Sequence, residues 1–481
     1  MSDAKADAIE PVPRELHSVR IANDKTNQSI YYREQEAYVT VAGLYDRRPT
    51  RVVRYRNIIR SVVDTAGSIT TRQTPVAEVD TYGGDSMQAK TAKEITRFGQ
   101  GVFAANSWPR LAKSSWLDAR LSAFGGVLWE VFHAVKDRPR RVVGTRLDPN
   151  CVWPNNNRPD KITIRRWLTP IEIEERGWGK KLKITDRDYG RIKDEDYGPT
   201  RVRDSRVVMI EQTWDLSADP AQMLVSLNGD AKRSFQEKYD ATRFPMAFCV
   251  WSEIPGSFYG VSVADLGRKY DAQINHQAHI ALDVAGRWMA PKLLTETNSE
   301  PTDQPWNSAA FEKIHYRGRP PTWFPGATLP AQFFDIYDRC KAEYHEEVGV
   351  SGSSVEATRP AGINSLPGQR EFQETITGRL APALERWEEF TRDSFEAMLS
   401  ECFRVLGKSK AKVAAPGRRA IESIDWAGAQ ASWDDIVVRV NKTSALPIHP
   451  AARREAVREL KADGVIKDQA SYLRLLGLHD L

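Results

Sequence analysis

The sequence predicts an α+β fold that is predominantly helical. Long segments on both sides of the middle of the chain repeat their apolar residues at helical spacing, whereas at about 140–250 apolar and polar residues alternate as in strands. No segment approaches the roughly 18 consecutive apolar residues of a membrane-spanning helix. A length of 481 residues suggests two to four domains of roughly 100–200 residues each. We therefore expect a β-rich insert carried on a helical base.

The composition is ordinary for a soluble protein. Hydrophobic residues make up 41% of the chain and charged residues 28%, which argues against wholesale disorder. The net charge of +5 is too small for a tight, non-specific nucleic-acid binder. The 4 cysteines lie far apart and predict neither a disulfide framework nor a zinc site. The first residues lack the apolar core of a signal peptide, so we expect an intracellularly made protein.

The N-terminal part predicts an arm followed by helices. The first 30 residues or so are polar and without period, which is typical of a mobile arm. Apolar residues then recur at helical spacing over 31–63. Asp85 or Ser86 is a favourable N-cap for a helix that continues to about residue 106. A further helix is predicted over 109–135, with Gly125-Gly126 as its weak point.

The β-rich insert is predicted from three segments in which apolar and polar residues alternate, at 161–167, 206–214 and 223–227. Asn228-Gly229 follows the last of them and is a strong signal for a tight hairpin turn. Residues 177–200 are charged and contain glycine, which predicts short helical and loop structure.

Two long helices and the segment between them form the most specific pattern in the chain. Residues 263–289 are predicted to form one uninterrupted helix, about 40 Å long at 1.5 Å per residue. Seven prolines break the helical pattern over 291–330, and a second helix is predicted over 331–348. Both helices carry apolar stripes, which we expect neighbouring subunits of a closed ring to cover. A helical hairpin within a monomer is the alternative.

The C-terminal part begins with a loop of small residues at 349–368. A third long helix is predicted over 369–405, with a kink at Pro382. A basic linker, a short strand at 434–440 and two small helices complete the chain.

No enzyme motif is complete. Gly407-Lys408-Ser409 resembles the end of a phosphate-binding loop, but it follows a helix and lacks the preceding glycine. His276, His279 and Asp283 have metal-ligand spacing on one helix, although polar interface residues are the commoner explanation for such a set. We therefore expect no catalytic residue, no metal and no cofactor.

The order of these elements resembles the portal proteins of tailed bacteriophages. Ser257-Phe-Tyr-Gly-Val-Ser leads into the first long helix, which contains Asp271-Ala-Gln-Ile-Asn. The other resembling features are the proline-rich segment, Gly-Val-Ser-Gly at 349–352, the loop-flanked third helix and the C-terminal pattern His449-Pro-x-x-Arg-Arg-Glu. The resemblance covers roughly 30–481, and the order is more specific than any one motif.

The resemblance implies a non-enzymatic ring at one capsid vertex, with twelve subunits as the expected number. The ring would conduct double-stranded DNA during packaging and ejection. The implied partners are further copies of the chain, the terminase large subunit, a head–tail adaptor, the major capsid and scaffold proteins, and double-stranded DNA bound without sequence preference. No membrane partner is implied. The protein would be made in the host cytoplasm and reside in the virion, at the portal vertex.

The resemblance also implies a division of the chain into the regions of a portal. These are a flexible arm (1–30), a wing (31–261), two stem helices (262–290 and 330–349), a clip (291–329), a tunnel loop (350–368), a kinked wing helix with a linker (369–420) and a crown (421–481).

Candidate site residues follow from these regions. The DNA-facing tunnel loop would include Ser351, Ser353, Ser354, Arg359 and Asn364. The clip would include Trp306, Arg317, Arg319 and Trp323. Contacts between the stems of neighbouring subunits would include Tyr270, Gln273, Ile274, Gln277, Tyr337 and Tyr344. Each neutralised phosphate adds salt-dependent affinity, so a channel with few cations suits loose, sliding contact with DNA.

Two other functions stay open. One is a metal-dependent DNA-processing enzyme, such as a nuclease or packaging ATPase, with His276, His279 and Asp283 as metal ligands. The other is a different minor head protein of the virion. Metal-dependent cleavage or ATP turnover would favour the enzyme, and rings with a central channel would favour a portal over another head protein.

Overall fold

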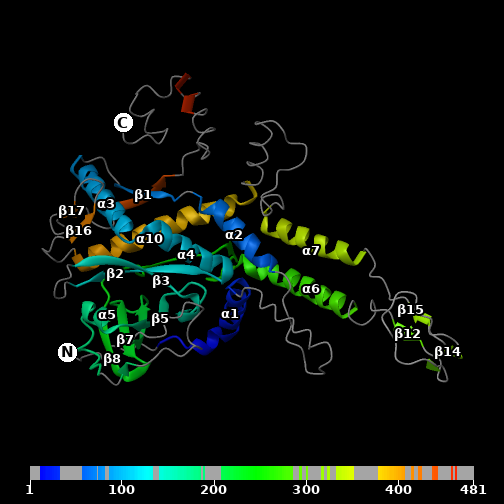
Figure 1. The fold of residues 1–481 in the computed structure, drawn as a ribbon. Coiled ribbons are helices and arrows are strands. Elements are labelled where there is room, and N and C mark those ends of the chain that lie inside the picture. Colours follow the sequence, from blue (N-terminus) through cyan, green and yellow to red (C-terminus); the bar gives the residue numbers. More distant parts are fainter. Residues whose placement is uncertain are drawn as a thin grey trace.

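Figure 1 shows the fold in a computed structural model of the chain, in which a helical hairpin projects from a layered body. The structure describes residues 11–32, 57–72, 74–81, 86–133, 140–185, 188–189, 207–284, 292–294, 300–301, 316–318, 322–324, 332–350, 378–406, 413–416, 421–424, 436–441, 457–458 and 461–462. Among these residues, no helix is both long enough and apolar enough to cross a membrane.

Of the helices of the body, α4 (Trp108–Leu121) and α10 (Ala381–Leu406) pack against a small central sheet, whereas α5 (Pro170–Glu175) packs against a second sheet. The other described helices of the body are η1 (Arg14–His17), α1 (Ser18–Tyr32), α2 (Ile58–Thr70), α3 (Ser86–Ala105) and η3 (Pro149–Cys151). The prediction of a helix from Ser86 to about residue 106 is confirmed by α3.

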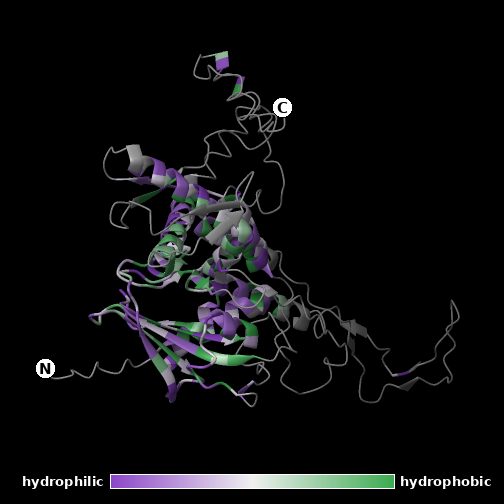
Figure 2. Cartoon of the chain, turned by 90° about the vertical axis from the view of Figure 1, so that its left-hand side faces the viewer, coloured by the Kyte–Doolittle hydropathy of each residue, from purple (hydrophilic) through white to green (hydrophobic). Residues whose placement is uncertain are grey.

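The central sheet has three antiparallel strands, with β2 (Gly125–Phe132) between β3 (Arg141–Leu147) and β9 (Met246–Cys249). The chain leaves this sheet after β3, forms a second sheet and returns at β9. The second sheet is antiparallel, in the order β4 (Val152–Pro154), β5 (Lys161–Leu168), β6 (Val208–Asp215), β7 (Gln222–Leu227) and β8 (Asp230–Lys238). Its strands carry both hydrophobic and hydrophilic residues in Figure 2, as expected of a sheet with one solvated face.

The structure confirms the hairpin turn between β7 and β8. Asn228 and Gly229 have φ values of 54° and 72°, the left-handed conformation that a two-residue hairpin of this kind requires. Short two-stranded sheets complete the body, formed by β1 (Val76–Thr81) with β18 (Ile436–Asn441), β10 (Ser252–Glu253) with β11 (Gly260–Val261), and β16 (Val413–Pro416) with β17 (Ile421–Ile424).

The prediction of a predominantly helical fold is wrong. The fold is α+β but mixed, with about half of it helical and 26% in strands. One reason is the predicted helix over 109–135, which is in fact α4 followed by β2. Almost every residue of β2 is buried, so its apolar residues run continuously and do not alternate with polar ones. A short buried run of this kind cannot be distinguished from a helix by periodicity.

Gly125 allows the change from α4 to β2. A Cβ atom at this position would lie 1.9 Å from the carbonyl oxygen of Ser115 in α4, so no larger residue fits. The glycine pair therefore marks a close approach of strand to helix and not a weak point within one helix.

Tryptophans join the layers of the core. Trp129 in β2 is fully buried, and its Nε1 donates a hydrogen bond of 2.8 Å to Oγ of Ser394 in α10. Trp116 in α4 is also fully buried and donates through Nε1 to Oγ1 of Thr70, at the end of α2, at 2.9 Å. Because these indole groups are satisfied, the large rings are buried without the cost of an unpaired donor.

The prediction of a flexible arm over 1–30 is wrong for the described part of that segment. Residues 14–32 form η1 and α1, which pack against the body. The buried residues of α1 are largely polar, with Asp24, Asn27 and Gln28 at 2%, 0% and 6% exposure. A helix is predicted from the spacing of its apolar residues, and the buried face of α1 is largely polar, so the sequence pattern did not predict this helix.

Two predictions for the C-terminal part can be compared with the structure. Residues 378 and 379 are helical, Leu380 forms a turn, and α10 begins at Ala381 with Pro382 in its first turn, so the helix is interrupted beside Pro382 as predicted. The predicted strand at 434–440 is confirmed by β18, but β18 pairs with β1 and contacts α10 in the body. The expected crown therefore does not begin at 421.

Candidate assembly site on the projecting hairpin

The projecting hairpin consists of α6 (Val263–Val284) and α7 (Gln332–Val348), which pack side by side and extend away from the body (Figure 1). Its 22-residue helix α6 is about 33 Å long at 1.5 Å per residue. The structure thus has a helix in each of the two segments predicted as stem helices, 262–290 and 330–349.

Short strands lie at the far end of the hairpin (Figure 1). Here β12 (Lys292–Leu294) pairs with β15 (Thr322–Phe324), and β13 (Glu300–Pro301) pairs with β14 (Tyr316–Arg317). Both pairs are antiparallel, so the chain runs outward and returns beside itself. We define these four strands as the tip of the hairpin.

A tight seam holds α6 against α7. Tyr344 of α7 lies over Gly267 of α6, where a Cβ atom would come within 2.5 Å of the tyrosine ring. The Tyr344 hydroxyl donates a hydrogen bond of 3.2 Å to the Val263 carbonyl oxygen. Ile274 and Cys340 are also buried, and Ile274 is only 3% exposed. The seam buries the apolar stripe of each helix against the other.

This seam corrects part of the predicted subunit contacts. Ile274 and Tyr344 are buried within a single chain, so their side chains cannot reach a neighbouring subunit. The argument that the two stripes need another subunit to cover them is therefore wrong for these residues. Gln273 is exposed, and Tyr270, Gln277 and Tyr337 are partly exposed, so these four keep a surface that a neighbour could contact.

Two exposed isoleucines on the outer surface of the hairpin were not predicted. Ile280 of α6 and Ile336 of α7 are each 38% exposed. A single exposed aliphatic residue is normal on a protein surface. Here, however, one lies on each helix of an element that has little of the body to pack against. Apolar residues at helical spacing identify the residues of the seam, but this pattern does not identify the two exposed isoleucines.

The outer surface of α7 is acidic. Asp335, Asp338, Glu343, Glu346 and Glu347 are exposed on this helix. Three cations partly offset this charge: Arg339 contacts Glu343 at 2.8 Å, Lys269 of α6 contacts Glu347 at 2.9 Å, and Lys341 of α7 is partly exposed. The remaining charge of the described α7 surface is negative.

The root of the hairpin is held by a capping box. Oγ of Ser262 accepts a hydrogen bond from the backbone N–H of Asp265 at 3.0 Å, and Asp265 accepts one from the backbone N–H of Ser262 at 3.3 Å. This reciprocal pair satisfies two backbone donors at the start of α6. Oγ of Ser262 also accepts a hydrogen bond of 3.5 Å from Nδ2 of Asn27 in α1, which lies against the root.

Several predicted site residues lie outside the described residues. These are the tunnel-loop residues Ser351, Ser353, Ser354, Arg359 and Asn364, and the clip residues Trp306 and Arg319.

Two clip residues fall within the described tip. Arg317 is exposed in β14, opposite Glu300, and Trp323 lies in β15, opposite Leu293. The structure therefore brings these two residues into the paired strands of the tip.

The proposed metal ligands lie on α6. His276 is exposed, whereas the side chains of His279 and Asp283 lie outside what the structure describes. Within the described part of the chain, no three His, Cys, Asp or Glu side chains are placed to hold a metal ion together.

A cavity of about 210 Å³ lies elsewhere, where β2, the five-stranded sheet and α10 meet. Two carboxylates in its wall have pKa values shifted in opposite directions. Burial would raise the pKa of Glu130, but Arg166 and Arg176 outweigh burial and hold that pKa well below its usual range. Burial raises the pKa of Glu401, against the opposing effect of Arg404.

Opposite pKa shifts of this kind can mark an acid–base pair, but ion-pair networks also produce them. Glu130 accepts hydrogen bonds from both Arg166 and Arg176, and Glu401 accepts two from Arg404. Glu130 is thus engaged in ion pairs that join β2 to β5 and to the residue after α5, whereas Glu401 is paired within α10. We assign this cavity to the packing of the body.

No protein-family model matches the chain, and no curated protein matches its sequence significantly.

Proposed function

We propose that the chain is a portal-type subunit, which assembles into a closed ring and conducts double-stranded DNA. The observation that supports this most strongly is the projecting α6–α7 hairpin with its strand-paired tip. A long, thin element of this kind exposes much surface for the little it buries, which favours packing against copies of itself.

The exposed side chains of the hairpin fit such packing. Ile280 and Ile336 provide apolar surface on the two helices, and Gln273 adds a side chain able to form hydrogen bonds between subunits. In a cyclic assembly, one surface of each hairpin would contact a different surface of the next, and closure of the ring would leave no hairpin uncovered. The number of subunits is expected to be twelve.

The acidic surface of α7 fits a channel through which DNA slides. If this surface lines the ring, each acidic position is repeated once per subunit around the axis. Carboxylates repel phosphates, so DNA would pass without the counterion release that produces tight binding. This refines the expectation of weak cationic contact, which rested on residues of the tunnel loop and the clip.

The tip and the body would serve the other partners. The tip lies at the end of the hairpin, away from the body, and is the part of a ring most accessible to a packaging motor or a head–tail adaptor (Figure 1). The body would contact the capsid and scaffold proteins. The protein would then act as a non-enzymatic component of the virion.

Mass photometry of the full-length chain tests the assembly. Twelve chains of 54.4 kDa give about 650 kDa. Replacing both exposed isoleucines with glutamate, Ile280→Glu with Ile336→Glu, should shift the population to monomers and short oligomers. The reason is that an unpaired charge buried between subunits costs several kcal/mol.

The matched control is Ile254→Glu, because Ile254 lies in the body and is 44% exposed. The control should assemble like the unmodified protein. A strictly monomeric unmodified protein at micromolar concentration would refute the proposed ring.

A further inference from the structure

Helix α1 lies across the root of the hairpin, and its interface is unusually polar. Asp24, Asn27 and Gln28 are buried in this interface, with Ile21 and Ile30 as its buried apolar residues. Interfaces between separately moving parts of a protein are more polar than permanent ones. The contacts of α1 therefore bear on whether the hairpin is fixed or adjustable.

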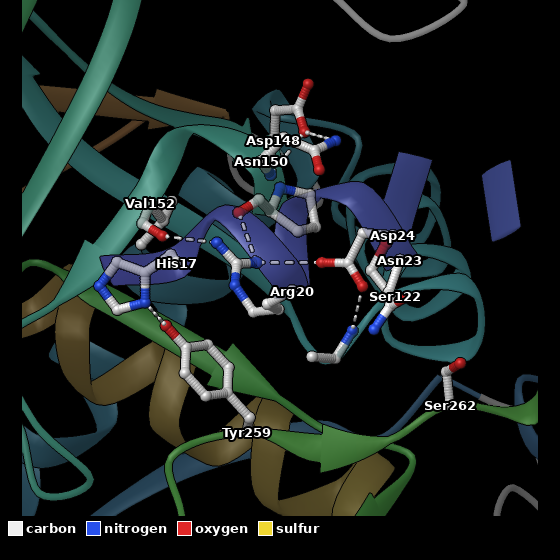
Figure 3. A network of polar contacts seen from close by, with 12 residues as sticks. His17, Arg20, Asn23, Asp24, Ser122, Asp148, Asn150, Val152, Tyr259 and Ser262 are labelled. Atoms are coloured by element: carbon white, nitrogen blue, oxygen red, sulfur yellow. Dashed lines mark hydrogen bonds and ion pairs between the residues drawn. The ribbon is translucent and has the colours of Figure 1, made fainter. Parts of the chain in front are cut away.

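On one side, α1 is bonded to the edge of the five-stranded sheet (Figure 3). Arg20 donates hydrogen bonds to the carbonyl oxygens of Pro149 at 2.9 Å and Val152 at 3.2 Å. Gln28 accepts one from Nδ2 of Asn150 at 3.3 Å. These bonds attach α1 to η3 and β4.

On the other side, α1 is bonded to the root of α6 through Asn27. Nδ2 of Asn27 donates to the Leu121 carbonyl oxygen and to Asp265, both at 2.9 Å. Oδ1 of Asn27 accepts from Nη2 of Arg268 at 2.8 Å. The Asn27 side chain is fully buried and uses both its donors and its acceptor, so it joins α1, α4 and α6 at one point.

Asp24 occupies the middle of α1, between these two sets of contacts (Figure 3). It accepts a hydrogen bond from Arg20 at 3.0 Å and another from the backbone N–H of Ala123 at 3.2 Å. The neighbouring titratable and charged groups are His17 and Arg20 of α1, Asp265 and Arg268 of α6, Tyr259 before β11, and Asp148 before η3.

We propose that α1 is a releasable strap, which fixes the angle between the hairpin and the body when docked and lets the hairpin tilt when it detaches. The contacts that dock it are largely hydrogen bonds, and they join the edge of the five-stranded sheet to the start of α6, where α6 also packs against α2 and α4. The strap itself follows from these contacts alone. Its use in adjusting the width of a channel rests on the proposed function.

The charge of Asp24 sets the direction in which the strap responds to pH. Burial raises the pKa of Asp24 to about 7, while Arg20 acts in the opposite direction. Above neutral pH, Asp24 carries a buried negative charge near Asp265. In the detached state the carboxyl is solvated and ionises at its ordinary, lower pKa. The Asp24 carboxyl therefore weakens docking as the pH rises from its ordinary pKa of 3.8 to about 7. Burial lowers the pKa of the neighbouring His17, and this group acts in the opposite direction.

Hydrogen–deuterium exchange of the full-length protein tests the strap, with rates corrected for the intrinsic effect of pH. Asn27→Leu keeps the size of the side chain and removes its hydrogen bonds. We expect exchange of α1 and the first turn of α6 to become at least tenfold faster, while β5 and β6 keep their protection. The matched control is Thr26→Ala at an exposed position of the same helix, which should change neither region.

The pH response gives a second readout that does not depend on Asn27. In the unmodified protein, corrected exchange of α1 should be several-fold faster at pH 8 than at pH 6, and Asp24→Asn should abolish this difference. The strap is refuted if α1 and β5 exchange at one common rate under both conditions. It is also refuted if α1 is released in Asn27→Leu and the root of α6 keeps its protection.

The angle of the hairpin can be measured directly with spin labels at two exposed positions, Asn156 in the turn after β4 and Ala342 in α7. All four native cysteines are buried, so introduced thiols react selectively. Labelled chain diluted in unlabelled chain should give a broader distance distribution for Asn27→Leu than for Thr26→Ala. Equal widths would overturn the proposal. Mass photometry of the same samples reports separately on ring assembly.

Discussion

The seam of the hairpin can be tested by a single methyl group, in the variant Gly267→Ala. The new Cβ would lie 2.5 Å from Cζ and 2.6 Å from the hydroxyl oxygen of Tyr344, well inside van der Waals contact. The Tyr344 ring is fully buried, so it cannot move aside without opening the seam. The overlap must therefore displace α7 from α6.

Three effects set the size of the loss in stability: two destabilise the hairpin and one stabilises it. Overpacking a filled site costs about 1–3 kcal/mol. Displacement of Tyr344 also breaks the hydrogen bond between its hydroxyl and the Val263 carbonyl oxygen, at about 1 kcal/mol. Alanine favours a helix over glycine by about 1 kcal/mol, which offsets part of the loss. The expected net effect is a loss of about 1–3 kcal/mol in the stability of the hairpin.

Hydrogen exchange of the α6 amides measures this loss as a free energy of local opening. The control is Gly378→Ala, at a helical glycine whose added methyl would have nothing within 4 Å. The control should retain or slightly increase protection. If Gly267→Ala protects α6 as well as the unmodified protein does, the packing of Tyr344 over Gly267 is wrong.

Two further predictions concern charge. Glu130→Gln should lower the free energy of unfolding by about 3–5 kcal/mol at pH 7, because Arg166 and Arg176 are left buried without their carboxylate. The pKa of Glu130 is lower in the folded protein than in the unfolded chain, so the stabilisation by this carboxylate is lost progressively as the pH falls below about 4.5. In urea unfolding, the free energies of the variant and of the unmodified protein should therefore converge in acid. A difference that stays constant with pH would count against the ion pairs. Glu346→Lys should make assembled rings retain double-stranded DNA more tightly and with a steeper dependence on salt in a filter-binding assay. Glu389→Lys, at an exposed position of α10 in the body, is the control, and equal effects from the two variants would argue against α7 as the channel lining.

The sequence predicts those elements whose apolar pattern is local. Helices α6 and α7 carry long stripes of helical period, and the turn at Asn228-Gly229 requires a conformation that these two residues favour. Strand β2 was hidden because it is buried on both faces. Helix α1 was hidden because Asp24, Asn27 and Gln28 occupy its buried face. The strands of the tip are two or three residues long and pair with distant residues, so no local pattern marks them.

The candidate site was predictable in outline but not by residue. The stripes of α6 and α7 identify Ile274 and Tyr344, yet a stripe cannot show whether another helix of the same chain or a neighbouring subunit covers it. The structure places both residues in the internal seam, which leaves Ile280 and Ile336 as the apolar residues that face outward. A single sequence contains no signal that separates these two kinds of burial.

The most direct test of the proposed function is a three-dimensional reconstruction of the purified full-length protein by cryo-electron microscopy. The account predicts a closed ring around a central channel, with the α6–α7 hairpins of adjacent subunits in contact and the acidic surface of α7 toward the axis. Single chains, or a ring in which the hairpins project outward and touch no neighbour, would contradict it.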